Sequence, residues 1–267
     1  MIPTYSRAFS TLGVPEMNLQ QVFALAASHR IEAVEPRVLE GTIELPKLWA
    51  RHHGTPAAMA ATLRDAKVKI VSLDTSFKLT GAAPGDREAF LEFLPWAEAL
   101  GVPWLRAFDG GKTADAATHR EMADTIAWWR ELRAKHGWKA DLMIETHDAL
   151  FTAEAIQGFV ALAPGTAILW DTHHTWHKGH EDPVETWRAI SPHVVHCHVK
   201  DSVPLPSARH DFTYVLPGEG QFPMAALREV LAREFTGAVS LEWERHWHPY
   251  LPPLDNALRA AAERNWW

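Results

Sequence analysis

Four apolar runs in the second half of the chain each end in a residue type that binds metal ions. Continuous apolar runs are typical of buried parallel strands, and the chain between consecutive runs is long enough for a crossover helix and two loops. Neighbouring parallel strands end at one edge of a sheet, about 4.8 Å apart. Three carboxylates and one imidazole should therefore meet there, which predicts a divalent-metal site with mixed oxygen and nitrogen ligands. The runs occupy residues 142–145, 167–171, 194–198 and 238–242, and they end in Glu145, Asp171, His198 and Glu242.

The same alternation of strand and helix extends over the whole chain. Eight strands, each followed by a helix, predict an α/β fold, namely a closed (β/α)₈ TIM barrel, with residues 1–267 as a single domain. The segment 37–54 is predicted to be a long irregular loop, because it contains Gly41, Pro46 and Gly54. The segment 84–100 is predicted to be one helix. The predicted strands are 3–10, 31–36, 68–74, 104–108, 141–145, 167–171, 194–198 and 238–243.

Composition excludes several classes of protein. Hydrophobic residues make up 47% and charged residues 22%, which indicates a packed globular core. The formal net charge is −7 and no basic block occurs, which argues against a nucleic-acid partner. The single cysteine, Cys197, excludes an intrachain disulfide framework and indicates a cytoplasmic location. No signal peptide and no apolar run of about 18 residues is found, so no membrane association is expected. The sequence leaves homo-oligomerisation open.

Other polar residues close strands in the first half of the chain. Glu35, Asp74 and Arg106 stand at such ends, where catalytic and binding groups of a barrel are found, and we expect them to contact substrate. A single polar strand end is equally well explained by exposure to solvent. Four consecutive strands that end in ligand-type residues are much harder to explain in that way.

Strand periodicity separates neighbouring candidates. His196 and His198 face the same side, and His198 is the expected ligand because it lies nearer the rim, with His196 a buried histidine one layer below. Glu242 and Glu244 also share one side of a strand, and Glu242 is the expected ligand because it ends the apolar run. Cys197 should point toward the helices. Trp176, on or near the rim, is a candidate for an apolar wall against a sugar, although core packing explains it equally well.

The motifs together resemble a known family. They are Glu-Thr-His at 145–147, Asp-Thr-His-His at 171–174, His-Cys-His-Val-Lys-Asp at 196–201, Pro-Gly-Glu-Gly at 217–220 and Ser-Leu-Glu-Trp-Glu at 240–244. As a set they resemble the xylose isomerase-like TIM-barrel superfamily of sugar phosphate isomerases and epimerases. The superfamily also contains ketose 3-epimerases, inosose isomerases and dehydratases, 3-dehydroshikimate dehydratases and the endonuclease IV branch.

The resemblance implies one divalent ion, commonly Mn²⁺ in this group, with Mg²⁺, Co²⁺ and Zn²⁺ as alternatives. Its ligands would be the four strand-end residues Glu145, Asp171, His198 and Glu242. The resemblance further implies that His174 contacts a substrate oxygen and that Lys200 is an active-site lysine.

The chemistry of such a site suits a small carbohydrate-like substrate. A divalent ion polarises a carbonyl and stabilises the enediolate that forms when the adjacent carbon loses a proton. Glu145 and Glu242 are candidate bases, and Lys200 or Arg106 can steady the developing charge. The leading interpretation is an isomerase or epimerase of a sugar, keto-sugar or sugar phosphate. The alternative is a dehydratase (lyase) of a keto-cyclitol, keto-sugar or dehydroshikimate-like substrate. A DNA-repair endonuclease and an inactive scaffold are further alternatives.

Two features of the chain bear on which reaction follows enolisation. The loop 200–221 is predicted to close over the substrate, with Gly218 and Gly220 as hinges and Arg209 as a donor. Phe151 and Pro204 stand where the resembled epimerases carry a glutamate and an arginine. His147, two residues after Glu145, is a candidate acid for a departing hydroxyl group.

Overall fold

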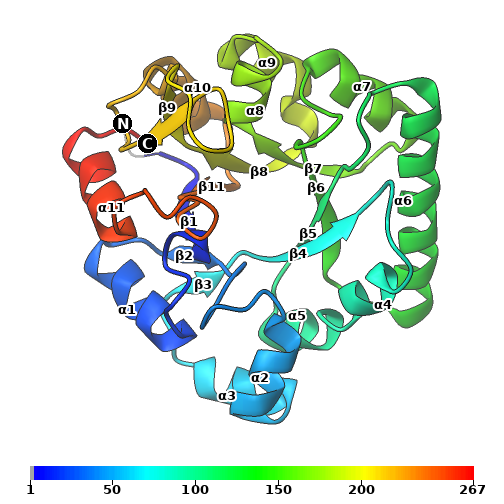
Figure 1. The fold of residues 1–267 in the computed structure, drawn as a ribbon. Helices are drawn as coiled ribbons and strands as arrows, with labels where there is room; N and C mark the ends of the chain where they lie inside the picture. The colour runs from blue at the N-terminus through cyan, green and yellow to red at the C-terminus, as the bar shows by residue number, and fades with distance from the viewer. Residues whose placement is uncertain (1–2) are drawn as a thin grey trace.

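The computed structural model describes residues 3–267 as a barrel of parallel strands enclosed by helices (Figure 1). The strand order is β3-β2-β1-β11-β8-β7-β6-β5-β4, and every pairing in this sheet is parallel. The strands are β1 (Ser6–Ser10), β2 (Ala33–Glu35), β3 (Lys69–Ile70), β4 (Ser72–Lys78), β5 (Trp104–Phe108), β6 (Asp141–Glu145), β7 (Ala167–Asp171), β8 (Val194–Val199) and β11 (Ala238–Leu241).

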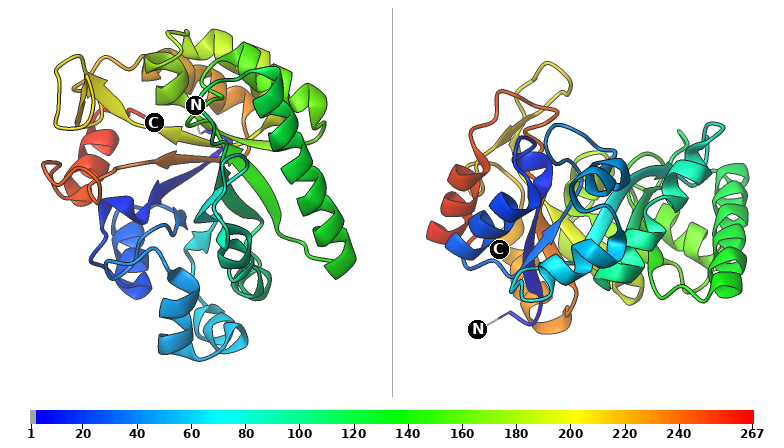
Figure 2. Two further views of the ribbon diagram at one scale, coloured as in Figure 1. Left: turned by 45° about the vertical axis from the view of Figure 1, so that its right-hand side comes forward. Right: turned by 90° about the horizontal axis from the view of Figure 1, so that it is seen from below.

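The nine strands of the sheet occupy the eight strand positions of a (β/α)₈ barrel. β3 and β4 are separated only by Val71, and they pair with β2 and β5 respectively. One stretch of chain therefore joins the two ends of the sheet, and the views in Figure 2 show the resulting nearly closed ring. The predicted α/β class and (β/α)₈ architecture are confirmed.

Helices cover the outside of the ring. They are α1 (Leu19–Ser28), α2 (Leu45–His53), α3 (Pro56–Leu63), α4 (Asp86–Leu91), α5 (Leu94–Leu100), α6 (Ala116–His136), α7 (Ala153–Leu162), α8 (Thr172–His177), α9 (Pro183–Ile190), α10 (Met224–Glu234) and α11 (Leu254–Glu263), with 3₁₀ turns η1 (Thr11–Gly13) and η2 (Ser191–His193). None of the helices in the described part of the chain is both long and apolar enough to cross a membrane.

Three predictions about helices are wrong in detail. The segment 37–54 is not wholly irregular, because its second half forms α2, where Pro46 occupies the first turn and needs no amide partner. The segment 84–100 is two helices, and the second begins immediately before Pro95 for the same reason. The additional helix α8 follows β7 directly, so two helices connect β7 to β8.

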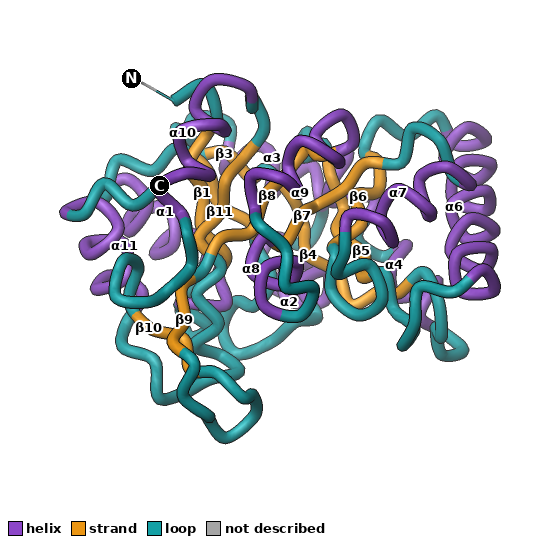
Figure 3. The backbone as a smooth tube through the Cα atoms, turned by 90° about the horizontal axis from the view of Figure 1, so that it is seen from above, coloured by secondary structure: helices purple, strands orange, loops and turns teal. Residues whose placement is uncertain are grey.

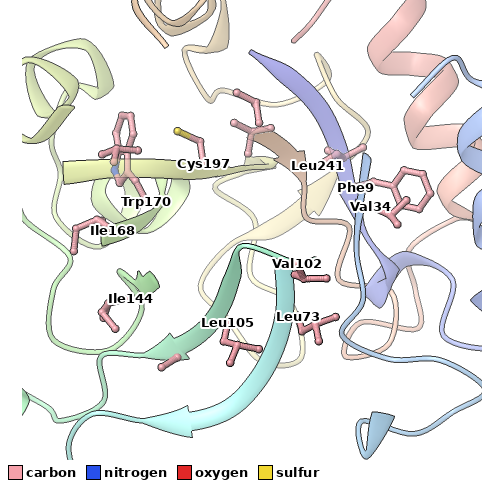
Figure 4. Close-up of a cluster of buried hydrophobic side chains, with 14 of the residues drawn as sticks. Phe9, Val34, Leu73, Val102, Leu105, Ile144, Ile168, Trp170, Cys197 and Leu241 are labelled. Carbon is pink, nitrogen blue, oxygen red and sulfur yellow. The ribbon is translucent and has the colours of Figure 1, made fainter. Parts of the chain in front are cut away.

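The alternation of side chains along the strands separates the core from the interior of the barrel. Trp170 and Cys197 are register partners on β7 and β8, and Figure 4 shows both projecting to the same side of these strands. The Trp170 indole donates a hydrogen bond to Thr175 and stacks on Trp187 of α9, so this side faces the helices. The next register pair, Asp171 and His198, must face the opposite side, as predicted.

The segment after β8 forms a hairpin. β9 (Asp201–Val203) and β10 (Thr213–Val215) pair in antiparallel fashion as a separate two-stranded sheet. Figure 3 shows this hairpin projecting from one end of the barrel. Because it begins directly after the carboxyl end of β8, the hairpin lies over the end at which the strand-end carboxylates meet.

Candidate metal centre

The four strand-end residues predicted as ligands converge in the structure. One side-chain donor atom from each of Glu145, Asp171, His198 and Glu242 lies within 4.8 Å of the others, and all four residues are buried. β6, β7 and β8 carry the first three, and Glu242 follows β11 directly. Adjacent parallel strands in register bring these ends together, which is the geometry that the apolar runs predicted.

His198 turns one ring nitrogen toward the carboxylates and the other toward a second acidic residue. Nδ1 lies 3.4 Å from Oε1 of Glu242 and 3.6 Å from Oε1 of Glu145. Nε2 lies 3.0 Å from Oε1 of Glu35, whose other oxygen is 2.7 Å from Nε2 of His196. Glu35 can therefore fix the ring of His198 with Nδ1 directed at the four-residue cluster. His196 is buried one layer below, as predicted.

Asp171 has two roles because it is the last residue of β7 and the N-cap of α8. Its Oδ1 accepts a hydrogen bond from the backbone N–H of His174, while Oδ2 is buried without such a partner. Burial raises the pKa of Asp171, and the charges of Glu242 and Glu145 raise it further against the opposing effect of Lys200. A divalent cation at this place would neutralise that repulsion.

Lys200 provides a fixed positive charge beside the cluster. Its ammonium lies 2.8 Å from Oδ2 of Asp171 and 2.8 Å from Oε1 of Glu244, and it also contacts Glu242. The hydroxyl of Tyr214 on β10 donates to the same Glu244 oxygen. Burial disfavours the ammonium, but Asp171 and the two glutamates outweigh it and raise the pKa of Lys200 well above its usual value.

Arg106 provides a second buried cation. Its guanidinium lies 3.2 Å from Oε2 of Glu145 and 3.8 Å from Oδ2 of Asp74, and it stacks over the Phe108 ring. Burial alone would raise the pKa of Glu145, yet the charge of Arg106 lowers it. Burial and the charge of Glu35 raise the pKa of Asp74 to about 7. Arg106 thus holds Glu145 in its ionised form.

A cavity of about 390 Å³ opens onto the cluster. Its walls come from many strand ends, from the β9–β10 hairpin and from the segment after β11, and they bring together most of the predicted site residues. Four of the predicted site residues are fully buried and lie outside this lining: Glu35, Asp74, Asp171 and His198. The prediction that Glu35 and Asp74 contact substrate is therefore not supported by the cavity lining. The lining residues used below are Arg37, Arg106, Glu145, His147, Asp148, His174, Lys178, Lys200, Arg209, Tyr214, Glu242 and Glu244.

His147 and His174 form an edge-to-face pair in the cavity wall, with ring centres 4.9 Å apart. Nδ1 of His174 lies 3.0 Å from the carbonyl oxygen of Thr146, which can only accept, so this nitrogen carries the proton. Burial lowers the pKa of His174 well below its usual value, so Nε2 is an acceptor. If His174 contacts a substrate oxygen, as the resemblance implies, Nε2 would accept a hydroxyl proton.

His147 differs from His174 because an acid pairs with it. Its Nδ1 lies 2.8 Å from Oδ1 of Asp148. Burial lowers the pKa of His147, but the hydrogen bond to Asp148 and the charge of Glu145 outweigh it, and the pKa is raised. His147 is therefore the more readily protonated member of the pair.

Two aspartates fix the loops around the cavity by accepting backbone amide hydrogens. Asp109, after β5, accepts from residues including Asp148, Ala149 and Leu150. Asp201 accepts from Ser202, Gly218, Gly220 and Phe222. A Cβ at Gly220 would lie 2.1 Å from Oδ1 of Asp201, so this glycine is required for close approach. Gly218 and Gly220 are thus held in place, contrary to the expectation that they act as hinges.

The structure agrees with the predicted position of the loop 200–221 but not with the predicted position of Trp176. The hairpin lies on the face of the cluster, and Arg209 lines the cavity. Trp176 does not: its ring packs edge-on against Phe222 and His173, because α8 directs it away from the cavity. The sequence analysis missed Arg37, Lys178 and Tyr214, and the charge of Arg37 directly after a strand end was the one available signal.

The donor set fits a divalent cation. Oε2 of Glu145 and Oδ2 of Asp171 form no hydrogen bond within residues 3–267, and each contacts a cation, Arg106 or Lys200. Nδ1 of His198 is also buried without a hydrogen bond and faces carboxylate oxygens of Glu145 and Glu242. Three carboxylates and one imidazole offer the oxygen and nitrogen ligands used by Mn²⁺, Zn²⁺ and related ions. Fold and site together define a (β/α)₈ barrel with a buried cluster of three carboxylates and one histidine that fits a divalent ion at the carboxyl ends of its strands.

The chain belongs to the xylose isomerase-like TIM barrel family, whose model matches residues 23–267. This match confirms the resemblance that the motifs indicated. No curated protein sequence matches the chain.

Solved structures share the fold at low sequence identity. A probable 3-DHS dehydratase, AsbF, from Bacillus anthracis is 19% identical with a TM-score of 0.78, and the match covers 97% of this chain and 100% of that one. The IolI protein with a bound zinc atom is 19% identical with a TM-score of 0.73, covering 97% and 96% of the two chains. A xylose isomerase domain protein from Salmonella typhimurium is 13% identical with a TM-score of 0.73, covering 98% and 97%.

Proposed function

We propose that the protein is a divalent-metal-dependent isomerase or epimerase of a small sugar, keto-sugar or sugar phosphate. The observation that carries the proposal is the convergence of Glu145, Asp171, His198 and Glu242 in one cluster. Two of its members, Glu145 and Glu242, line a cavity that Lys200 and Arg106 also line. The zinc atom of the IolI neighbour supports a metal at such a site, and Mn²⁺ remains our expected ion.

The residues that line the cavity beside the cluster have separate roles in the proposed reaction. The bound ion would polarise a carbonyl of the substrate and stabilise negative charge on its oxygen. Glu145 and Glu242 are the two candidate ligands that line the cavity, and we assign to them the removal of the proton from the adjacent carbon. Lys200 stabilises the charge that develops there, and Nε2 of His174 accepts a proton from a substrate hydroxyl. The buried walls keep bulk water away from the carbanion.

Dehydration is the second candidate, and the position of His147 favours it. His147 lines the cavity with Nδ1 tied to Asp148, so its protonated form is stabilised and Nε2 can deliver a proton to a departing hydroxyl. The fold similarity to the probable 3-DHS dehydratase is compatible with this reaction. Both reactions begin with the same proton removal, and they differ in whether a β-hydroxyl then leaves.

Two features argue against the endonuclease branch. Asp74 on β4 and Arg106 on β5 stand where a multinuclear site needs further imidazole ligands, and neither is a histidine; the chain also carries a net charge of −7. A protein that binds a nucleic-acid backbone is usually basic along one face.

Exchange of the substrate α-proton with solvent deuterium tests the proposal directly. Metal-loaded protein in D₂O is incubated with a panel of polyhydroxylated ketones, their phosphates and their acids, and the loss of the α-proton is followed by NMR. We expect exchange for at least one compound, its abolition by a chelator, and a loss of about a hundredfold in Lys200→Met with the metal retained. Lys47→Met changes an exposed lysine and is the matched control.

The proposal predicts that exchange depends on both the metal and Lys200. If no ketone in the panel exchanges its α-proton, or if chelator-treated protein exchanges as fast as the loaded protein, the proposed function is wrong.

A further inference from the structure

Arg37 is a buried cation in the cavity wall with no role in the metal centre. It follows β2 and Pro36, and its backbone N–H donates to the hydroxyl of Thr11. Only 6% of its surface is exposed. The guanidinium donates one hydrogen bond, from Nη1 to the carbonyl oxygen of Asp74 at 3.3 Å. Its side chain is therefore held in one place, with most of its donors unused.

The charge of Arg37 has no counter-ion. Within residues 3–267 no carboxylate oxygen lies within 4.0 Å of it, although Arg106 and Lys200, the other buried cations of the cavity, each contact carboxylates. Burial lowers the pKa of Arg37 to about 10, and the neighbouring charge of Arg106 acts in the same direction. The charges of Asp74, Glu145 and Glu242 oppose this shift but do not reverse it. A buried, unpaired guanidinium is unfavourable, so such a group in a binding cavity indicates an anion that is supplied from outside.

The charge of the whole cavity supports the same conclusion. Six cationic side chains line it against four carboxylates, in a protein whose net charge is −7. Three of the cations form no ion pair with a carboxylate within residues 3–267, and of these only Arg37 is buried, since Lys178 and Arg209 are at the rim. Among these three unpaired cations, Arg37 is therefore the one whose charge is most shielded from water.

We propose that Arg37 binds a carboxylate group of the substrate, so that the substrate is a small polyhydroxylated keto acid. The inference rests on the proposed function and narrows its substrate class. The planar guanidinium has free N–H donors for two parallel hydrogen bonds, and this bidentate arrangement matches the geometry of a carboxylate. Arg37 lines the same cavity of about 390 Å³ as Glu145 and Glu242, so the carboxylate would sit within one small molecule's length of the reacting carbon.

Binding of a non-reacting acid tests the proposal without requiring turnover. Calorimetry on the metal-loaded protein compares quinate, a polyhydroxylated ring carboxylate, with its uncharged methyl ester, and glucose 6-phosphate serves as the phosphate arm. We expect the Kd of quinate to be at least tenfold lower than that of the ester. A tenfold change in Kd is about what one hydrogen bond to a charged group contributes. In Arg37→Met that preference should disappear. Arg37→Lys should retain part of it, because a lysine keeps the charge but loses the planar donors.

Arg133→Met is the matched control, because Arg133 contacts Asp141 and two carbonyls at the amino end of β6, away from the cavity. The metal content of each variant shows whether its site is intact. Equal binding of quinate and its ester by the wild-type protein, or no binding of quinate at millimolar concentration, overturns the proposal without any use of the variants. Tighter, Arg37-dependent binding of the phosphate would overturn the carboxylate assignment. Because the readout is binding, failure of α-proton exchange would contradict the proposed function alone.

Discussion

Oε1 of Glu35 lies 3.0 Å from Nε2 of His198, on the side of the ring away from the nitrogen that faces Glu145 and Glu242. A carboxylate in this position fixes the orientation of a ligand histidine and increases its basicity. We therefore expect Glu35→Gln to weaken metal binding by about 10- to 100-fold. Competition titration with a chromophoric chelator measures the effect. Glu32→Gln, at an exposed position three residues earlier, should bind as the wild type does, and equal affinities for the two variants would refute the role of Glu35.

Asp171 allows the metal site and a helix cap to be separated. We expect the wild-type protein to bind about one ion per chain, and Asp171→Asn and Asp171→Ala should both lose most of it. Asparagine still accepts the His174 amide hydrogen, whereas alanine cannot, so the metal-free alanine variant should be less stable by about 1 kcal/mol. Urea unfolding of both metal-free variants measures this difference. Retention of the metal by either variant would show that Asp171 is not a ligand.

His147 distinguishes the two candidate reactions. His147→Ala should lower turnover at least about tenfold if His147 delivers a proton to a leaving hydroxyl, and the metal should stay bound. Ordinary ketohexoses should be poor substrates, because Phe151 and Pro204 lack the polar contacts of the epimerases that the sequence resembles. Steady-state kinetics together with metal analysis tests both expectations. Rapid 3-epimerisation of a free ketohexose that His147→Ala leaves unchanged would exclude this role.

Asp201 should control the order of the segment over the cavity. Asp201→Ala removes the acceptor of four backbone amides and should lower the free energy of unfolding by about 3 kcal/mol. Protease cleavage within residues 203–216 should become faster, which limited digestion and mass spectrometry can follow. Asp211→Ala, at an exposed position in the same hairpin, is the control. Equal cleavage of the two variants would contradict the anchoring role.

The sequence contained enough information for the barrel and for the four candidate ligands. Apolar runs reveal buried strands, and parallel strands in register bring their ends together, so Glu145, Asp171, His198 and Glu242 follow from pattern alone. The same reasoning placed His196 below His198 and directed Cys197 toward the helices, as the structure has them.

The remaining differences lie where tertiary contacts decide the local structure. α8 begins at Thr172 because Asp171 caps it. The sequence pattern predicted Asp171 as the end of a strand, and it gave no sign that the same residue also starts a helix. That helix turns Trp176 away from the cavity. Asp109 and Asp201 accept amide hydrogens from residues distant in sequence, and no local pattern records this. Arg37 was overlooked because Pro36 marked the end of a strand and the following segment was predicted to be an irregular loop.

The Asp201 anchor also bears on how this barrel can change over evolutionary time. Asp201 holds both ends of the hairpin segment, at Ser202 and at Gly218 to Phe222, independently of the residues between them. Substitutions or insertions between Val203 and Val215 can therefore alter what the cavity admits while the strand ends that carry the ligands stay in place. Selection for a new substrate can therefore act on the tip of this hairpin without disturbing the candidate metal ligands beneath it.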